Sequence, residues 1–141
     1  MAIIGLMAAI SAPSISAGLD SIRMASATQS VASFLNSGVT HAERSQQPVE
    51  LVIAPKENLL TAYSNEPGFE RELQLPDGIS IEAILPQTPD DAIDPVRRLL
   101  LMPGGTVPGI GIQLANSHGT RRLVRLDPMT GFPRVENVTK Q

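Results

Sequence analysis

The pattern of apolar residues changes about one third of the way along the chain. Residues 2–19 are all apolar or small, and the first charged side chain is Asp20. Apolar residues then return at a loose helical spacing, with polar residues on the other face. The apolar positions are Leu19, Ile22, Val31, Phe34, Leu35, Val39 and Ala42, with Ala25, Ala27 and Ala32 between them. Because Pro48 disfavours a helical residue before it, one helix is predicted over residues 3–46, roughly 66 Å long at about 1.5 Å per residue.

Two residues within this predicted helix are poor helix formers. Pro13 lacks a backbone N–H, and Gly18 gains conformational freedom when the helix opens. We therefore expect the helix to bend or to melt locally at these positions, with Pro13 as the kink.

The apolar run before Asp20 is open to more than one interpretation. It is shorter than the about 20 apolar residues that cross a bilayer, and it contains Pro13 and several serines. It also lacks the basic start of a secretory signal peptide. It is therefore the lower part of a longer membrane helix, a signal peptide, or a helix packed in the core.

After Pro48 the apolar pattern alternates, which is typical of strands. Strands are predicted over 49–54, 59–64, 70–75, 79–85, 98–102, 109–115, 121–126 and 132–135. Turn residues at Lys56-Glu57-Asn58 and Pro76-Asp77-Gly78 predict two hairpins, and the short connections predict an antiparallel meander. The expected fold class is α+β: a helix over 1–47 packed on an antiparallel β-sheet domain over 48–141, with about six to eight short strands.

Composition limits the core and the chemistry. Aromatic residues make up only 3% of the chain, so we expect an aliphatic core and no aromatic-lined ligand pocket. The chain has no cysteine, which excludes disulfides, thiolate nucleophiles and thiolate metal sites.

Charge is distributed unevenly. The chain carries a net charge of -3, whereas residues 97–141 hold seven basic and two acidic residues, a net +5. The basic residues are Arg97, Arg98, Arg121, Arg122, Arg125, Arg134 and Lys140. Such asymmetry suggests that the chain binds a partner with a charged surface, and nucleic acid is one such partner.

Four of these residues, the C-terminal arginines, fall on two neighbouring predicted strands. They are Arg121, Arg122, Arg125 and Arg134. On a strand, Arg121 and Arg125 share one face and Arg122 takes the other, and Arg134 can come alongside from the next strand. One interpretation is a solvated edge that discourages strand aggregation. The other is a surface for a phosphate backbone or an acidic subunit.

The remaining polar motifs favour structural interpretations. His41 and His118 are far apart without metal-ligand neighbours and are expected to be solvated. Asp90, Asp91 and Asp94 lack the other ligands of a Ca²⁺ loop. The glycine-rich segment 104–111 lacks the Gly-Lys-Ser/Thr ending of a phosphate loop and is expected to connect a hairpin. Asp127-Pro128-Met129-Thr130-Gly131 is a strong turn signal. No catalytic, cofactor or metal site is predicted.

The N-terminal segment resembles the membrane helix of type IV pilins and pseudopilins. The shared string is Ala2-Ile3-Ile4-Gly5-Leu6-Met7-Ala8-Ala9-Ile10, followed by Pro13. The long amphipathic helix, Gln47-Pro48-Val49 and a late string are similar to the H-type minor pseudopilin and FimT family. That late string comprises Gly105-Thr106, Gly109, Ile112-Gln113-Leu114, Gly119, Arg122, Val124 and residues 127–131. The resemblance covers nearly the whole chain.

This resemblance implies a pilin-like fold and a structural function, with no enzymatic activity, cofactor or small-molecule substrate. Residues 1–19 would lie in the bacterial inner membrane before assembly and in the filament core afterwards, and the β domain would lie in the periplasm. The implied partners are other pseudopilin or pilin subunits, the inner-membrane assembly platform and the lipid bilayer.

Two assemblies are compatible with the resemblance. H-type subunits belong to the pseudopilus of type II secretion, which exports proteins across the outer membrane. FimT-type subunits belong to type IV pili, and some bind DNA through a basic C-terminal region, which the C-terminal arginines would provide here.

Members of this family begin with a basic leader, a glycine cleaved by prepilin peptidase, and a Phe-Thr-Leu-x-Glu start with a methylated amine. The match to this chain starts inside the family's membrane helix. We therefore expect the start of that helix to lie upstream, and we assign cleavage and methylation to no residue of this sequence.

Overall fold

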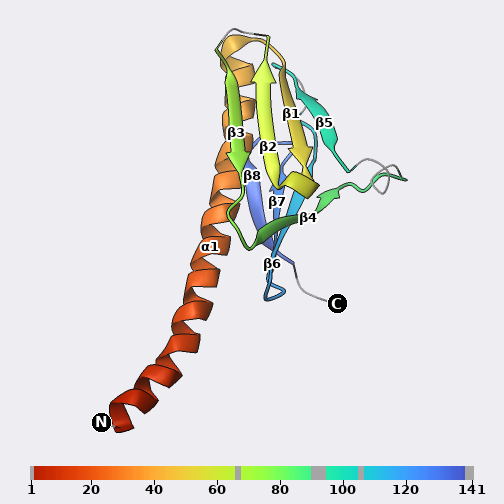
Figure 1. Cartoon of the computed structure of the whole chain (residues 1–141). Helices are drawn as coiled ribbons and strands as arrows, with labels where there is room; N and C mark the ends of the chain where they lie inside the picture. Colours follow the sequence, from red (N-terminus) through yellow and green to blue (C-terminus); the bar gives the residue numbers. More distant parts are fainter. Residues whose placement is uncertain (1, 66–67, 90–94, 105–106, 139–141) are drawn as a thin grey trace.

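One helix and two antiparallel four-stranded sheets make up the fold (Figure 1). The computed structural model describes residues 2–65, 68–89, 95–104 and 107–138, and only the backbone of residues 2–17 and of Asp20. The helix α1 spans Ala2–Ser45, close to the predicted bounds. The predicted α+β class is confirmed, and the antiparallel β domain consists of two sheets.

The strands lie close to their predicted positions. The first sheet has the order β3-β2-β1-β5 and the second the order β4-β6-β7-β8. The first contains β1 (Val49–Ala54), β2 (Leu59–Ser64), β3 (Glu70–Gln74) and β5 (Arg97–Leu101). The second contains β4 (Ile79–Leu85), β6 (Gly111–Asn116), β7 (Arg121–Leu126) and β8 (Pro133–Asn137). A short 3-10 helix, η1 (Pro55–Glu57), joins β1 to β2.

The predicted meander is wrong at three connections, because β3–β4, β4–β5 and β5–β6 each join strands of different sheets. β3 pairs with β2 and β4 pairs with β6, so the turn at Pro76-Asp77-Gly78 crosses between sheets and forms no hairpin. Asn58 holds this crossing, because its carbonyl accepts from the Leu75 N–H at 3.0 Å and its Oδ1 accepts from the Ile81 N–H at 3.0 Å. The segment 104–111, also expected to connect a hairpin, likewise leads from β5 in one sheet to β6 in the other.

The C-terminal half of α1 closes the core. Its buried face contains Met24, Ala27, Val31, Leu35 and Ala42. These positions are three or four residues apart, as expected for one face of an α-helix. The exception is the interval from Leu35 to Ala42, where the buried residue on this face is Gly38. The predicted apolar stripe was wrong at its start, since Leu19 and Ile22 are 48% and 65% exposed and Met24 is buried instead. The helix ends at Ser45, and Gln46 follows with a φ of 55°, the left-handed conformation that often follows a helix.

Aliphatic side chains from both sheets meet this helical face. The most deeply buried are Leu51, Ile53 and Leu60 from the first sheet and Ile112, Leu114 and Leu126 from the second. Phe69 is the one aromatic side chain among the buried residues described, as the low aromatic content predicted.

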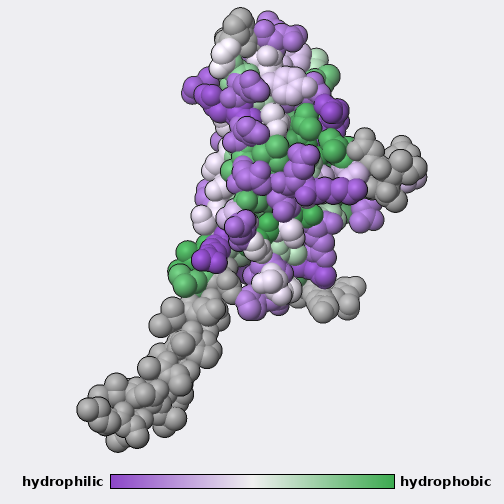
Figure 2. All heavy atoms as spheres, viewed as in Figure 1, coloured by the Kyte–Doolittle hydropathy of each residue, from purple (hydrophilic) through white to green (hydrophobic). Residues whose placement is uncertain are grey.

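The N-terminal part of α1 projects beyond the β domain (Figure 1). The helix is uninterrupted at Pro13 and Gly18, so the expected local melting does not occur, although its ribbon curves along the projecting part. Figure 2 shows apolar atoms where α1 leaves the β domain. Leu19 and Ile22, in this part of the helix, are both exposed. No helical stretch within the described residues has both the length and the hydropathy of a membrane span.

Candidate functional surfaces

The C-terminal arginines are divided between the two faces of the second sheet. Arg121 and Arg125 share the face that points away from the core, and Arg122 lies on the opposite face with Val124 and Leu126, as strand alternation predicted. Arg134 lies directly opposite Arg125 in the β7–β8 register, so the expected approach of these two residues is confirmed.

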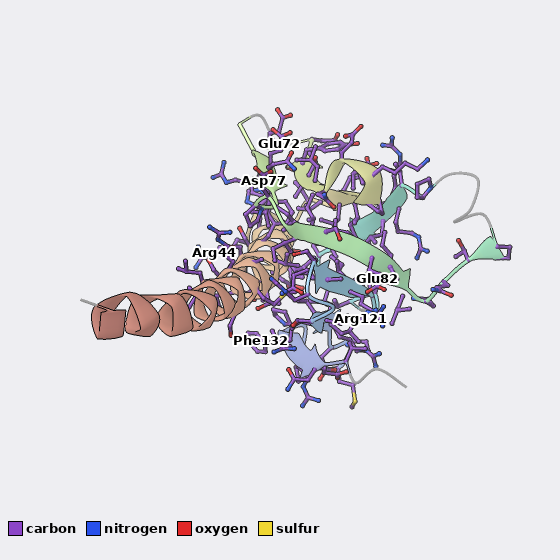
Figure 3. The ribbon with its side chains drawn as sticks, turned by 60° about the horizontal axis from the view of Figure 1, so that its bottom comes forward. Arg44, Glu72, Asp77, Glu82, Arg121 and Phe132 are labelled. Atoms are coloured by element: carbon purple, nitrogen blue, oxygen red, sulfur yellow. The ribbon has the colours of Figure 1, made fainter. Side chains whose placement is uncertain are left out.

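Arg121 is held by a carboxylate. Its Nη2 lies 2.8 Å from Glu82 Oε1, and Glu82 Oε2 accepts a hydrogen bond from Gln113 Nε2 at 3.0 Å. Glu82 reaches this position through a β-bulge, because the β4–β6 register shifts between Ile81 and Ala83. Figure 3 shows Glu82 and Arg121 side by side. Arg121 is therefore part of a local ion pair, which reduces its availability to a phosphate.

Arg122 is directed toward α1. It lines a hollow of about 340 Å3 together with Ser21 and Met24 of the helix and with His118 and Thr120 of the β6–β7 turn. Its Nη1 donates to the carbonyl of Arg121 at 2.9 Å. Arg122 therefore belongs to the junction between the helix and the second sheet, separate from the other three arginines.

Arg125 and Arg134 form the exposed remainder of the basic surface. The Arg134 side chain is 71% exposed, and its Nε lies 3.7 Å from Asp127 Oδ2, a loose contact. Large apolar side chains accompany this pair: Met129 is 93% exposed and Phe132 is 65% exposed. Figure 3 places Phe132 at the start of β8. A basic pair beside exposed apolar side chains has the character of an interaction surface.

The turn before β8 is built as the sequence predicted. Asp127 Oδ1 accepts from the Met129 N–H at 2.9 Å, and the Asp127 carbonyl accepts from the Gly131 N–H at 2.8 Å. Gly131 has a φ of 77°, which only glycine adopts without strain. The motif is structural, and it fixes where Phe132 and Arg134 emerge.

The two histidines lie in different environments. His118 is exposed in the β6–β7 turn. His41, expected to be solvated, is instead half-buried and stacked on Phe69, with ring centroids 3.6 Å apart and planes 8° apart. The prediction failed because Phe69 is distant in sequence and comes from the segment that leads into β3.

No cluster suited to a metal ion occurs among the described residues. The acidic residues Asp90, Asp91 and Asp94 lie outside that part of the chain, as do Gly105, Thr106 and Lys140. The residues that the structure describes therefore offer surfaces and grooves as candidate functional features.

A polar groove that the sequence analysis missed runs between α1 and β3. It has a volume of about 550 Å3. Its walls, which we call the α1–β3 groove, are Ser33, Asn36, Ser37, Thr40, His41, Arg44, Gly68, Phe69 and Arg71. The polar face of the helix was recognisable in the sequence, but only the fold shows that Gly68, Phe69 and Arg71 lie opposite it.

Comparisons with known proteins give no identification: no protein-family model, no curated protein and no solved structure matches this chain.

Proposed function

We propose that this chain is a structural minor pseudopilin, a non-enzymatic subunit that assembles through its N-terminal helix. The observation that carries this proposal is the mismatch between the helix and the domain on which it packs. α1 has 44 residues, and its first buried side chain among those described is Met24. The preceding segment, roughly 33 Å long at about 1.5 Å per residue, projects from the β domain (Figure 1).

A helix that projects into water is only marginally stable unless another surface packs against it. An isolated helix in water is marginally stable even when its residues are good helix formers, and residues 2–19 are apolar or small. Leu19 and Ile22 are exposed at the base of the projection. Apolar side chains in such a place favour a partner of similar chemistry, such as the corresponding helix of a neighbouring subunit.

The architecture is also compatible with a pilin-like fold. In such a fold the C-terminal half of a long helix packs on an antiparallel β domain, and the N-terminal half remains available to other subunits. Here the second half of α1 supplies core residues such as Val31 and Leu35. The resemblance of residues 2–10 and of the late string to the H-type minor pseudopilin and FimT family supports the same proposal.

The proposal includes location and partners. The chain resides in the bacterial inner membrane with its β domain in the periplasm, and it joins other pilin-like subunits in a type II secretion pseudopilus. Its task is mechanical, so its functional residues are those that meet neighbouring subunits.

Fractionation and co-purification test this proposal. The chain, expressed from its own gene in its own host, is expected in the inner-membrane fraction together with other pilin-like subunits. Ile22→Asp should abolish co-purification because it places a charge on the apolar contact. Ser26→Asp, one helical turn along and also exposed, should retain it. Recovery of the unchanged chain as an unassociated periplasmic protein would refute the proposal.

One observation favours a second candidate function, DNA binding by a FimT-type minor pilin. Arg125 and Arg134 face each other across β7 and β8 and are both exposed. Such a pair would contact a phosphate backbone with strong salt dependence. Arg125→Ala with Arg134→Ala should then remove the binding, whereas Arg121→Ala, at a residue already paired with Glu82, should have little effect. Equal DNA affinity in the double variant would exclude this function.

A further inference from the structure

We infer that the α1–β3 groove binds an oxyanion carried by a hydroxylated small molecule, of the class of sugar phosphates and acidic sugars. This inference goes beyond the proposed assembly function, which involves no small-molecule ligand. It rests on the polar lining of the groove, on two arginines that form no ion pair with any described residue, and on the contact that holds one of them against an aromatic ring.

The helix wall of the groove is a row of hydrogen-bonding side chains. Ser33 is three and four residues from Asn36 and Ser37, and these two are four and three residues from Thr40, so all four line the groove from one side of the helix. Each can both donate and accept a hydrogen bond. Such a wall can form hydrogen bonds with the hydroxyl groups of a polar ligand, whereas it offers few apolar contacts to an apolar ligand.

Arg44 on α1 and Arg71 on β3 supply positive charge from opposite walls. Neither takes part in an ion pair with the residues that the structure describes. Other arginines do: Arg98 lies 3.7 Å from Glu50, and Arg121 lies 2.8 Å from Glu82. Among the described residues, no carboxylate lines the α1–β3 groove. Its two guanidinium groups therefore remain available to an external anion.

Arg71 is held against a stack of rings. Its Cζ lies 5.4 Å from the centroid of the Phe69 ring, and Phe69 stacks on His41 of α1 with 3.6 Å between centroids. Phe69 is only 9% exposed, so it anchors the stack to the core. A guanidinium beside an aromatic ring loses less conformational freedom on binding a ligand. The stack also fixes β3 relative to the helix wall.

The groove continues along the helix and changes character. An adjoining hollow of about 390 Å3 shares Ser33, Ser37 and Arg71 with it and adds Gln29, Ser30, Phe34, Glu72 and Leu73. The carboxylate of Glu72 disfavours an anion in this second hollow but can accept hydrogen bonds from hydroxyl groups. The ligand therefore places its oxyanion between Arg44 and Arg71 and its hydroxyl groups toward Gln29 and Glu72.

Guanidinium groups are suited to both phosphate and carboxylate, because their N–H donors match the geometry of either oxyanion. Titrations of the full chain with glucose 6-phosphate and with glucuronate therefore show whether the groove prefers a phosphate or a carboxylate. Backbone amide shifts measured by NMR should map to the α1–β3 groove. Glucose should bind far more weakly than both acids, and inorganic phosphate should bind more weakly than glucose 6-phosphate.

Substitutions on the two walls test the assignment. Arg44→Gln and Arg71→Gln should each raise the Kd of the better acid about fivefold or more, the loss expected for one charge-assisted hydrogen bond at an exposed site. Arg125→Gln makes the same change of charge on the other sheet and should leave the Kd unchanged. Ser33→Glu, at an exposed helix position, should abolish binding by bringing a carboxylate into the groove.

Four results would overturn the inference. Glucose binding as tightly as glucose 6-phosphate would remove the role of the oxyanion, and inorganic phosphate binding as tightly would remove that of the hydroxyl groups. An unchanged Kd in the Arg44→Gln and Arg71→Gln variants, or an equal loss in Arg125→Gln, would show that binding does not occur in this groove.

Discussion

Tyr63 illustrates how a single side chain reports on the register of a sheet. It lies opposite Glu50 in the β1–β2 pairing, where its hydroxyl can donate to the Glu50 carboxylate. This hydrogen bond raises the pKa of Tyr63 above its usual 10.0, and partial burial and the negative charge of Glu50 add to the rise. Arg98 acts in the opposite direction. The phenol is protonated in the state that makes the bond.

The first prediction concerns this titration. Tyr63 is the only tyrosine and the chain has no tryptophan, so tyrosinate absorbance follows it alone. Its midpoint should lie above 10.0 in the folded protein and fall toward that value in Glu50→Gln. Since the folded-state pKa is raised, the linked stabilisation is present below pH 10 and disappears as the pH rises through the folded-state pKa. An unshifted midpoint in the unchanged protein would contradict the β1–β2 register.

Asn58 connects the two sheets through one residue. It adopts the left-handed conformation, with a φ of 52°, and its Oδ1 accepts from the backbone N–H of Ile81. Asparagine tolerates this conformation better than most residues, and its side chain satisfies a donor that would otherwise be left without a partner.

The second prediction separates these two roles. Asn58→Ala should lower the free energy of unfolding by about 2 kcal/mol, because it strains the backbone and removes the acceptor. Asn58→Gly avoids the strain but lacks the acceptor, and Asn58→Asp keeps an acceptor and tolerates the left-handed conformation, so both should lose less than Asn58→Ala. Urea denaturation measures these differences. Equal stability of Asn58→Ala and the unchanged protein would refute the proposed connection.

At the scale of elements, the sequence predicted the strands better than their partners. Alternation and turn residues are local signals, so β1, β2, β4 and β7 begin and end where the pattern indicated. Which strands pair is not a local property. The turn at Pro76-Asp77-Gly78 reverses the chain, but β3 and β4 separate because each pairs with a different strand.

The helix shows the same limit. Its length was predictable because Pro48 and the polar face mark its extent, but its buried face begins about one turn later than predicted. Leu19 and Ile22 are more apolar than Ala27, yet they lie beyond the end of the β domain and remain exposed. Only the fold shows where the sheets stop covering the helix.

Two glycines of α1 give the third prediction, one for each part of the helix. A Cβ added at Gly38 would lie 3.0 Å from Leu101 Cδ1, whereas one added at Gly18 would meet nothing within 4 Å. Gly38→Val should destabilise the protein by about 1–3 kcal/mol through overpacking. Gly18→Ala should stabilise the helix by up to about 1 kcal/mol. Thermal unfolding distinguishes the two, and a tolerated valine at Gly38 would contradict the close packing of α1 on β5.

At the scale of the whole molecule, charge is arranged differently from its order in the sequence. The C-terminal arginines are close in sequence, but Arg121 is paired with Glu82 and Arg122 lies at the helix. The two arginines that share a groove, Arg44 and Arg71, come from α1 and β3 and carried no common signal in the sequence. A binding surface assembled across two elements cannot be recognised from spacing along one of them.

The central claim is that α1 is the contact through which this chain joins an assembly. The most direct measurement replaces Ile22 by a photo-crosslinking amino acid in the host cell and identifies the adducts by mass spectrometry. Ile22 is 65% exposed, so the substitution should not disturb the β domain. We predict adducts with other pilin-like subunits that disappear when detergent dissolves the assembly before irradiation. If Ile22 gives no adduct with any such subunit in intact cells, the claim is wrong.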